Sequence, residues 1–282
     1  MVDDAGRGAL SWAEEGRETT AALAETWGSL ARVCRGLRPA DWEAGTACPG
    51  WTVRDQLSHL IGIERALLGE APPAWSAPLG DHVRNEFAAA NEPWVAVRRT
   101  RSGEAVRAEF VAVNGRRLVV LDALAEEDWA RVGPSVVGDV AYAEFLRVRV
   151  FDSWVHEQDV RLALRRPGGS GGQASRLAIG RVQSAMGFVV GKKAAAPEGT
   201  VVRFSVTGPP DDARQFAIGV AGGRAVPVAD DGAPTVTLTM SSIDFVRLGC
   251  GRATAGEVAP AVGVVGDESL GARILGSMNF MF

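Results

Sequence analysis

The sequence lacks the features that would direct it to a membrane, to export or to nucleic acid. Among its 282 residues, no apolar run approaches the roughly 18 residues that span a bilayer. The acidic start of the chain has neither the basic nor the apolar region of a signal peptide. A net charge of −4 and a pI near 5.5 provide no field for nucleic acid. We therefore expect a cytoplasmic protein, monomeric or homodimeric, without nucleic-acid or membrane partners.

Cysteine is also scarce. Cys34, Cys48 and Cys250 are an odd number and show no C-x-x-C spacing. This excludes a disulfide framework and a thiolate zinc site as the organising feature of the chain. Cys48 stands beside a Pro-Gly pair and has two interpretations: a reactive thiol, or a small residue packed at a turn.

The hydrophobic content of 46% is ample for one large domain or two modest ones. Apolar residues at helical spacing predict helices over residues 10–37, 52–68, 82–90, 94–124, 140–166 and 174–190, with a loop over 126–138. The Glu-Pro-Trp sequence at 92–94 is expected to open the fourth helix.

The composition changes after residue 192. Short β-branched runs between Gly and Pro turns predict strands over residues 200–207, 215–220 and 235–240, and short helices over 241–249 and 267–278. The predicted fold class is therefore mainly α with a smaller α+β part. The expected domains are residues 1–191, a helical bundle with the candidate metal site, and residues 198–282, a small α+β domain.

Asp152 and His156 lie four residues apart on the helix predicted over 140–166. At this spacing two side chains share one face and can close on a single ion. The same face carries an apolar stripe of Phe145, Val148, Val160 and Ala163. A carboxylate and an imidazole buried there require partners. They are either a buried hydrogen-bonded or ionic pair, or two ligands of a metal site.

His59 offers a third ligand for such a site. It lies on the helix predicted over 52–68 and shares its face with Ile63, Ala66 and Leu67. Two inward histidines and a carboxylate from two helices would form a three-ligand site with an open position, as in catalytic zinc sites. His82 is the remaining histidine. Its polar neighbours near a helix start indicate a surface residue rather than a ligand or substrate contact.

Three segments together resemble a known family. Residues 48–59 have the sequence Cys-Pro-Gly-Trp-Thr-Val-Arg-Asp-x-Leu-x-His, and residues 154–161 have Trp-Val-His-Glu-Gln-Asp-Val-Arg. A Gly-Asp pair at 266–267 precedes a closing helix. In this combination, over nearly the whole chain, the sequence resembles the mycothiol-dependent maleylpyruvate isomerase family, which belongs to the wider DinB-like metalloenzymes.

The resemblance implies a DinB-like four-helix bundle that carries a divalent metal, usually zinc, followed by a sterol-carrier-like α+β domain. By motif position, the family's metal ligands fall on His59, Asp152 and His156. The isomerase has glutamate where this chain has Asp152. Aspartate is one methylene shorter, so coordination through it requires a closer helix or a bridging water.

Two further residues are candidates for supporting roles. Asp159 follows His156 by three residues and is a candidate acceptor for its imidazole N–H, or else forms an ion pair with Arg161 or Arg165. Arg252 resembles an arginine that the family may use at the mouth of its site. It would clamp a substrate carboxylate, or else face solvent.

The resemblance implies mycothiol as cosubstrate and a small-molecule electrophile as its partner. A zinc ion with three protein ligands has room for a thiol sulfur and lowers the pKa of that thiol. In the isomerase the thiolate adds to a cis double bond, the bond rotates and the thiol is eliminated. A transferase would release the adduct. Two alternatives remain open, a metal-dependent hydrolase and a non-catalytic small-molecule-binding protein.

Overall fold

The computed structural model describes residues 10–76, 80, 83, 85–135 and 138–281. The chain divides into two compact units. We call residues 1–43 with 53–157 the helical unit, and residues 44–52 with 158–282 the sheet unit. The domain boundary expected between residues 191 and 198 stays a prediction. Within the described residues, no helix is both long enough and apolar enough to cross a membrane.

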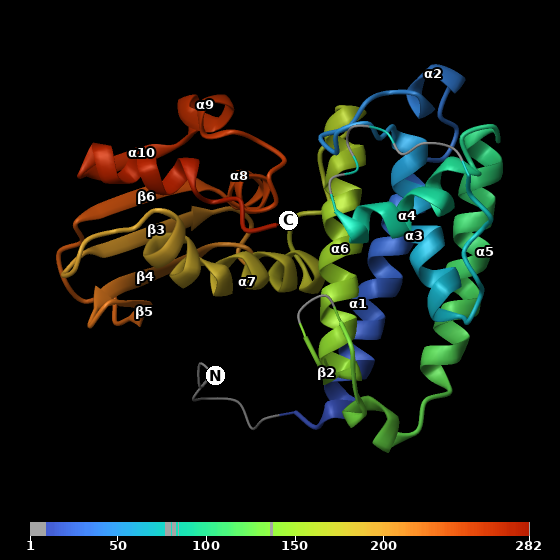
Figure 1. The fold of residues 1–282 in the computed structure, drawn as a ribbon, viewed down its shortest axis with the longest axis horizontal. Coiled ribbons are helices and arrows are strands. Elements are labelled where there is room, and N and C mark those ends of the chain that lie inside the picture. Colours follow the sequence, from blue (N-terminus) through green and yellow to red (C-terminus); the bar gives the residue numbers. More distant parts are fainter. Residues whose placement is uncertain (1–9, 77–79, 81–82, 84, 136–137, 282) are drawn as a thin grey trace. The chain divides into compact units, whose positions relative to one another are not determined.

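The helical unit is built on the long helices α1, α3, α5 and α6 (Figure 1). Its elements are α1 (Trp12–Val33), α2 (Pro39–Trp42), α3 (Val53–Leu67), α4 (Glu86–Ala96), α5 (Gly103–Asp122), the 3-10 helix η1 (Glu126–Ala130), the short strands β1 (Val132–Gly133) and β2 (Val140–Ala141), and most of α6 (Tyr142–Ala163). Helix α5 packs against both α1 and α3. The predicted four-helix bundle is therefore observed, with the two candidate metal motifs on α3 and α6.

A capping box begins α1, and a side-chain hydrogen bond connects this helix to α6. The Ser11 hydroxyl accepts from the Glu14 backbone N–H at 3.2 Å, and the Glu14 carboxylate accepts from the Ser11 N–H at 2.8 Å. This reciprocal capping box satisfies two backbone donors at the helix start. Farther along, the buried Trp27 indole N–H donates to the Ser153 hydroxyl at 3.1 Å. Polar contacts as well as apolar packing thus fix α6 in the bundle.

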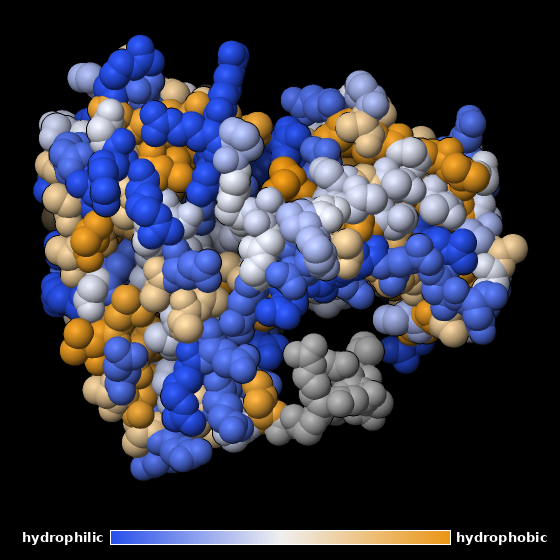
Figure 2. All heavy atoms as spheres, turned by 180° about the vertical axis from the view of Figure 1, so that it is seen from behind, coloured by the Kyte–Doolittle hydropathy of each residue, from blue (hydrophilic) through white to orange (hydrophobic). Residues whose placement is uncertain are grey.

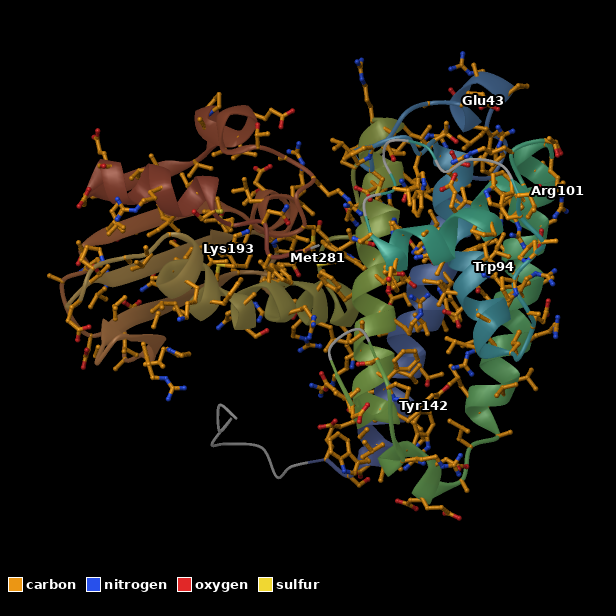
Figure 3. All side chains as sticks on the ribbon, in the orientation of Figure 1. Glu43, Trp94, Arg101, Tyr142, Lys193 and Met281 are labelled. Carbon is orange, nitrogen blue, oxygen red and sulfur yellow. The ribbon has the colours of Figure 1, made fainter. Side chains whose placement is uncertain are left out.

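Helices α3 and α4 approach each other closely at Gly62. A Cβ atom placed on Gly62 would lie only 2.4 Å from the Cβ atom of Trp94. Trp94 lies on α4 in the helical unit (Figure 3) and is 7% exposed. Glycine is therefore required one turn after His59, because a larger residue would push the two helices apart.

The helix expected over 94–124 is wrong in its boundaries. Helix α4 begins earlier, where the Asn85 side chain caps it by accepting from Ala88 N at 2.8 Å, and Pro93 lies inside it. A new helix starts at Gly103, with Ser102 as its N-cap. The sequence analysis placed Pro93 at the start of a helix, where proline is common. It did not identify Ser102 as the residue that caps the next helix. Residues 81 and 82 lie outside the described residues, so the expected surface position of His82 stays a prediction.

The sheet unit contains a five-stranded sheet in the order β5-β4-β3-β6-β7. Its strands are β3 (Val201–Thr207), β4 (Arg214–Ala221), β5 (Arg224–Val228), β6 (Val236–Ser241) and β7 (Gly263–Gly266), and its helical elements are α7 (Gln173–Phe188), η2 (Val189–Lys193), α8 (Ser242–Gly249), α9 (Ala255–Val258), η3 (Ala259–Ala261) and α10 (Glu268–Gly276). Strands β3 and β6 pair in parallel, and the other neighbours are antiparallel. The mainly α chain with a smaller α+β part is thereby confirmed.

Buried and more exposed side chains alternate along β3, and the buried ones form part of the core of the sheet unit. Every second residue of the strand is buried, including Phe204. Its ring stacks on Phe216 of β4 at 4.9 Å between centroids and meets Phe245 of α8 edge-on at 6.1 Å. Helix α8 therefore covers the sheet through aromatic contacts.

Over the face drawn in Figure 2, hydrophobic residues lie in separate groups among hydrophilic ones, as is usual for a protein surface.

Candidate metal centre

Three predicted ligands meet in the core of the helical unit. His59 comes from α3, whereas Asp152 and His156 come from successive turns of α6. The Nε2 atom of His59 lies 3.5 Å from Oδ2 of Asp152, and the Nε2 atom of His156 lies 3.5 Å from Oδ1. One ligand atom from each residue falls within 4.8 Å of the others. The helical spacing thus produces the juxtaposition that the sequence analysis expected.

The spacing and chemistry of these three donors fit a divalent metal. Zinc binds imidazole nitrogen and carboxylate oxygen at about 2.0–2.2 Å, so two ligands at a tetrahedral angle lie about 3.3 Å apart. The nitrogen-to-oxygen distances of 3.5 Å are close to that value. They are long for direct hydrogen bonds. The arrangement is therefore better suited to a shared ion than to a hydrogen-bonded pair, although the assignment as ligands stays a prediction.

Burial and charge favour the protonation states that a metal requires. Burial lowers the pKa of His59 to about 4, which leaves its imidazole neutral near pH 7. Burial disfavours the Asp152 carboxylate, but the positive charge of Arg149, with smaller contributions from the two histidines, holds its pKa well below the usual value. A neutral imidazole and an ionised carboxylate are the forms that bind a cation.

Gln56 fixes the orientation of the second histidine. Its side-chain oxygen hydrogen-bonds to Nδ1 of His156, and Gln56 is completely buried. Because an amide oxygen only accepts, Nδ1 carries the proton and the Nε2 lone pair is left for a metal. The sequence analysis did not identify Gln56. Its position three residues before His59, on the same helix face, was the available signal.

The Asp152 side chain is more exposed than the two histidines. It is 25% exposed, whereas the His59 and His156 side chains are 3% and 6% exposed. Arg149 donates to its Oδ2 atom at 2.7 Å. Asp152 is therefore held by Arg149 and is at the same time the most exposed of the three candidate ligands.

A second polar cluster lies within the sheet unit. Arg252 donates from Nε to both carboxylate oxygens of Asp159 at 3.2 and 3.0 Å. The Cys48 thiol donates to the same carboxylate at 3.4 Å and is 7% exposed. Burial lowers the pKa of Arg252, but the charge of Asp159, smaller contributions from Cys48 and Cys250, and the hydrogen bond to Asp159 together raise it. Asp159 thus forms its ion pair with Arg252, and its expected role beside the His156 imidazole stays a prediction.

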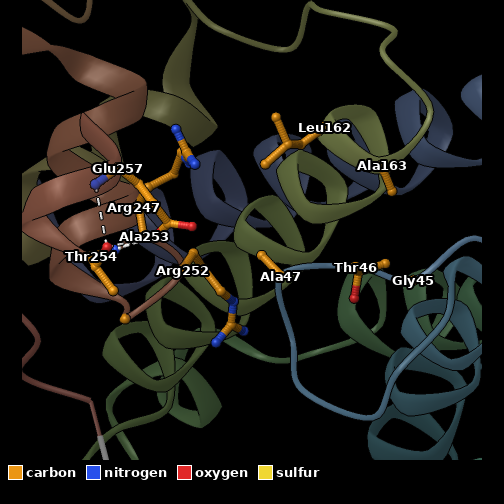
Figure 4. A pocket seen from close by; sticks show the side chains of 11 residues that line it. Gly45, Thr46, Ala47, Leu162, Ala163, Arg247, Arg252, Ala253, Thr254 and Glu257 are labelled. Carbon is orange, nitrogen blue, oxygen red and sulfur yellow. Dashed lines mark hydrogen bonds between the residues drawn. The ribbon is translucent and has the colours of Figure 1, made fainter. Parts of the chain in front are cut away.

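A cavity of about 390 Å³ opens beside this cluster, and Figure 4 shows it from close by. Arg247, Arg252 and Glu257 line it, together with two threonines and with small or apolar residues. At its edge the Thr254 backbone and hydroxyl donate to Glu257 at 2.7 and 2.8 Å. Nε of Arg247 is buried and has no hydrogen-bond partner among the described residues. Two guanidinium groups therefore line the cavity, that of Arg252 paired with Asp159 and that of Arg247 paired with Asp244.

These features define a protein with a candidate metal site in a helical bundle and an arginine-lined cavity in an α+β unit. Residues 23–161 match the family model described as the mycothiol maleylpyruvate isomerase N-terminal domain. This part of the chain belongs to that family, and the resemblance predicted from the sequence is confirmed. No curated protein matches the chain.

Solved structures show a similar fold over most of the chain. A crystal structure of the mycothiol-dependent maleylpyruvate isomerase is 16% identical, with a TM-score of 0.53, and covers 91% of this chain and 95% of that one. A mutant of that enzyme is 17% identical, with a TM-score of 0.52 and the same coverage. A sterol carrier protein 2 like 2 from Aedes aegypti is 16% identical over 36% of this chain and 95% of its own, with a TM-score of 0.29.

Proposed function

We propose that this protein is a divalent-metal-dependent enzyme that activates a low-molecular-weight thiol, mycothiol, for addition to an electrophilic small molecule. It acts as an isomerase or as a thiol S-transferase. The family match of residues 23–161 and the whole-chain likeness to the isomerase support an enzyme of this kind. Zinc is the proposed metal, because two imidazoles and one carboxylate are a usual set for it.

One observation carries the proposal: His59, Asp152 and His156 present two nitrogens and a carboxylate within 4.8 Å of one another. These side chains would hold the metal. When bound, the metal would supply the Lewis acidity that lowers the pKa of a thiol, so that the thiolate forms at neutral pH. Gln56 would keep Nε2 of His156 free of its proton, and the exposed side of Asp152 would admit the thiol.

The arginine-lined cavity is the proposed contact for a carboxylate on the electrophile. Nε of Arg252 is already bound by Asp159, which fixes the plane of the guanidinium before any ligand arrives. A pre-oriented guanidinium loses less entropy when it binds a carboxylate in a bidentate manner. Asp159 would then act through Arg252 rather than on the reacting atoms.

Replacing Arg252 with lysine should weaken binding of a carboxylate-bearing electrophile selectively. Lysine keeps a positive charge beside Asp159 but cannot form the planar fork. We expect the KM for the carboxylate to rise about 10- to 100-fold, because a hydrogen bond to a charged group contributes about 1.5–3 kcal/mol. The methyl ester of the same electrophile serves as control, and its KM should not change. An equal effect on acid and ester would contradict the clamp.

Turnover with purified protein tests the proposed function directly. The zinc-loaded enzyme is mixed with mycothiol and a panel of electrophiles, among them cis-configured unsaturated diacids, and their loss is followed with and without the thiol. An isomerase returns the thiol and yields the trans compound, whereas a transferase consumes one thiol for each adduct. No thiol-dependent loss of any electrophile, with metal bound, would refute the proposal.

The same experiment separates the two alternatives. Thiol-independent cleavage of esters or amides by the metal-loaded protein would indicate a hydrolase that uses a metal-activated water. Binding of a small molecule without turnover, in a protein that takes up no metal, would indicate a binding protein. We further propose a cytoplasmic location and a monomer or homodimer. Cell fractionation tests the location, and size-exclusion chromatography with light scattering tests the oligomeric state.

A further inference from the structure

A buried line of charged side chains runs through the helical unit to the candidate metal site. The Tyr142 hydroxyl contacts Arg117, whose Nε donates to one oxygen of Glu64 at 3.1 Å. Arg149 donates to the other Glu64 oxygen and then to Asp152. Arg117 and Glu64 are 1% exposed and Arg149 is 4% exposed. Burying a charge at this depth costs free energy unless an opposite charge pairs with it. Which arginine pairs with which carboxylate therefore matters for the stability of the line.

Arg149 is held on two edges of its guanidinium. Its Nε and Nη2 atoms donate to the same oxygen of Glu64 at 2.9 and 2.7 Å. Its Nη1 atom donates to Oδ2 of Asp152 at 2.7 Å. The guanidinium is planar and rigid, so it cannot turn without breaking all three hydrogen bonds. The position of the Asp152 carboxylate is thereby tied to Glu64.

The line connects the two helices that carry the predicted ligands. Glu64 follows His59 by five residues on α3, and Arg149 precedes Asp152 by three residues on α6. The distance between the helices at the site is therefore set by this ion pair as well as by packing. For a carboxylate as short as aspartate, that distance decides whether its oxygens reach the point between the two imidazoles.

We propose that Arg149 is a positioning residue for the metal site: it holds Asp152 in the rotamer that ligation requires, and Glu64 holds Arg149. This inference rests on the proposed function, because it presumes that His59, Asp152 and His156 bind a metal. Arg149 itself touches neither the metal nor the substrate.

A purely structural role for Arg149 is the competing interpretation. Two arginines and two carboxylates make up the network, and Arg117 alone can balance the charge of Glu64. The charge and the third hydrogen bond of Arg149 are then left for Asp152. If Arg149 only joined the helices, its contact with Glu64 would be sufficient.

The direction of the effect on metal affinity distinguishes positioning from simple electrostatics. Removing a positive charge beside a cation site should strengthen binding if repulsion were its main influence. Loss of an outer partner that orients a ligand typically weakens metal affinity by about 10- to 100-fold. Positioning by Arg149 therefore predicts weaker binding in spite of the lost repulsion.

The test compares Arg149→Met and Arg149→Lys with wild type and with Arg147→Met. Arg147 lies on the same helix and forms ion pairs with Glu15 and Glu144, but its side chain is 40% exposed. The dissociation constant for zinc is measured by competition with a chromophoric chelator. The visible spectrum of the cobalt(II)-loaded protein reports the coordination geometry, which a merely structural role would not alter.

We expect both Arg149 variants to bind zinc about 10- to 100-fold more weakly and to show a changed cobalt spectrum. Arg147→Met should stay within about twofold of wild type, as expected for an exposed pair. Arg149→Lys keeps a buried charge for Glu64 and decides the question if Arg149→Met does not fold. A folded Arg149 variant with wild-type or tighter zinc binding overturns the inference. A wild type that binds no zinc refutes the proposed function instead, and this inference with it.

Discussion

Replacing His59 or His156 with alanine should remove the metal from the protein and abolish its thiol-dependent reaction. Each imidazole supplies one of three proposed ligands, and the two that remain cannot hold a catalytic metal firmly. We expect near-stoichiometric metal in wild type and less than about a tenth of that content in either variant. Turnover should fall about a thousandfold or more, because metal catalysis contributes several kcal/mol and each 1.36 kcal/mol is tenfold in rate.

The measurement is plasma mass spectrometry on protein purified without a histidine tag, followed by the thiol assay on the same samples. His82→Ala is the matched control, since it removes the third histidine of the chain and should leave both metal content and turnover unchanged. Circular dichroism identifies the variants that remain folded. Full metal content in both folded variants would show that the ion binds elsewhere. If wild type contains no metal, even after dialysis against zinc, Asp152 and His156 would instead be a buried pair in the core.

The candidate ligands could be predicted from the sequence for a simple physical reason. Asp152 and His156 are four residues apart, and helix geometry alone places such residues on one face. His59 could be paired with them because the chain contains only three histidines. Local periodicity thus predicts that Asp152 and His156 share a face, whereas their meeting with His59 in the core also depends on how α3 and α6 pack.

The partners of these ligands could not be predicted in the same way. Glu64 and Arg149 are 85 residues apart in the chain, and His156 and Gln56 are 100 residues apart. Such pairs depend on the register between helices, which a hydrophobic pattern does not fix. A glutamate or an arginine on a helix also occurs most often on a solvated face, so burial of Glu64 and Arg149 contradicts the prior expectation.

The fold was predictable where a segment was long and its pattern strong. The central strands of the sheet and the long helices were expected within a few residues, apart from the break between α4 and α5. Two edge strands were missed. In β5, Val226 and Val228 are 42% and 40% exposed and flank a proline, so no buried face is visible in the sequence. The four residues of β7 begin and end with glycine. The paired strands β1 and β2 are too short to show a period; β1 lies inside the expected loop, and β2 takes the first two residues of the helix expected over 140–166.

Replacing Glu64 with leucine should strongly destabilise the helical unit. Both Arg117 and Arg149 lose their shared carboxylate, and each is almost fully buried. Breaking a buried ion pair by removing one partner typically costs about 3–5 kcal/mol, because the remaining charge is left without compensation. We expect a decrease of that size in the free energy of unfolding of the metal-free protein.

Urea unfolding in the presence of a chelator measures this decrease, with tryptophan fluorescence as the probe. Of the eight tryptophans only Trp51 belongs to the sheet unit, so the signal reports mainly on the helical unit. Glu104→Leu is the matched control, because it removes a carboxylate paired with Arg107 that is 59% exposed. Exposed pairs contribute at most about 1 kcal/mol. A cost for Glu64→Leu no greater than that of the control would contradict a buried network.

A second substitution shows whether the cost arises from the missing charge or from poor packing of leucine. In Glu64→Leu with Arg117→Leu, the cation that depended on Glu64 is removed as well, and Arg149 retains Asp152. Replacing both members of a buried pair with apolar residues is often neutral or stabilising. The double variant should therefore be more stable than Glu64→Leu alone, although it carries one more change. If it is less stable, packing rather than charge balance governs this part of the core, and the line of ion pairs from Arg117 to Asp152 has little influence on the fold.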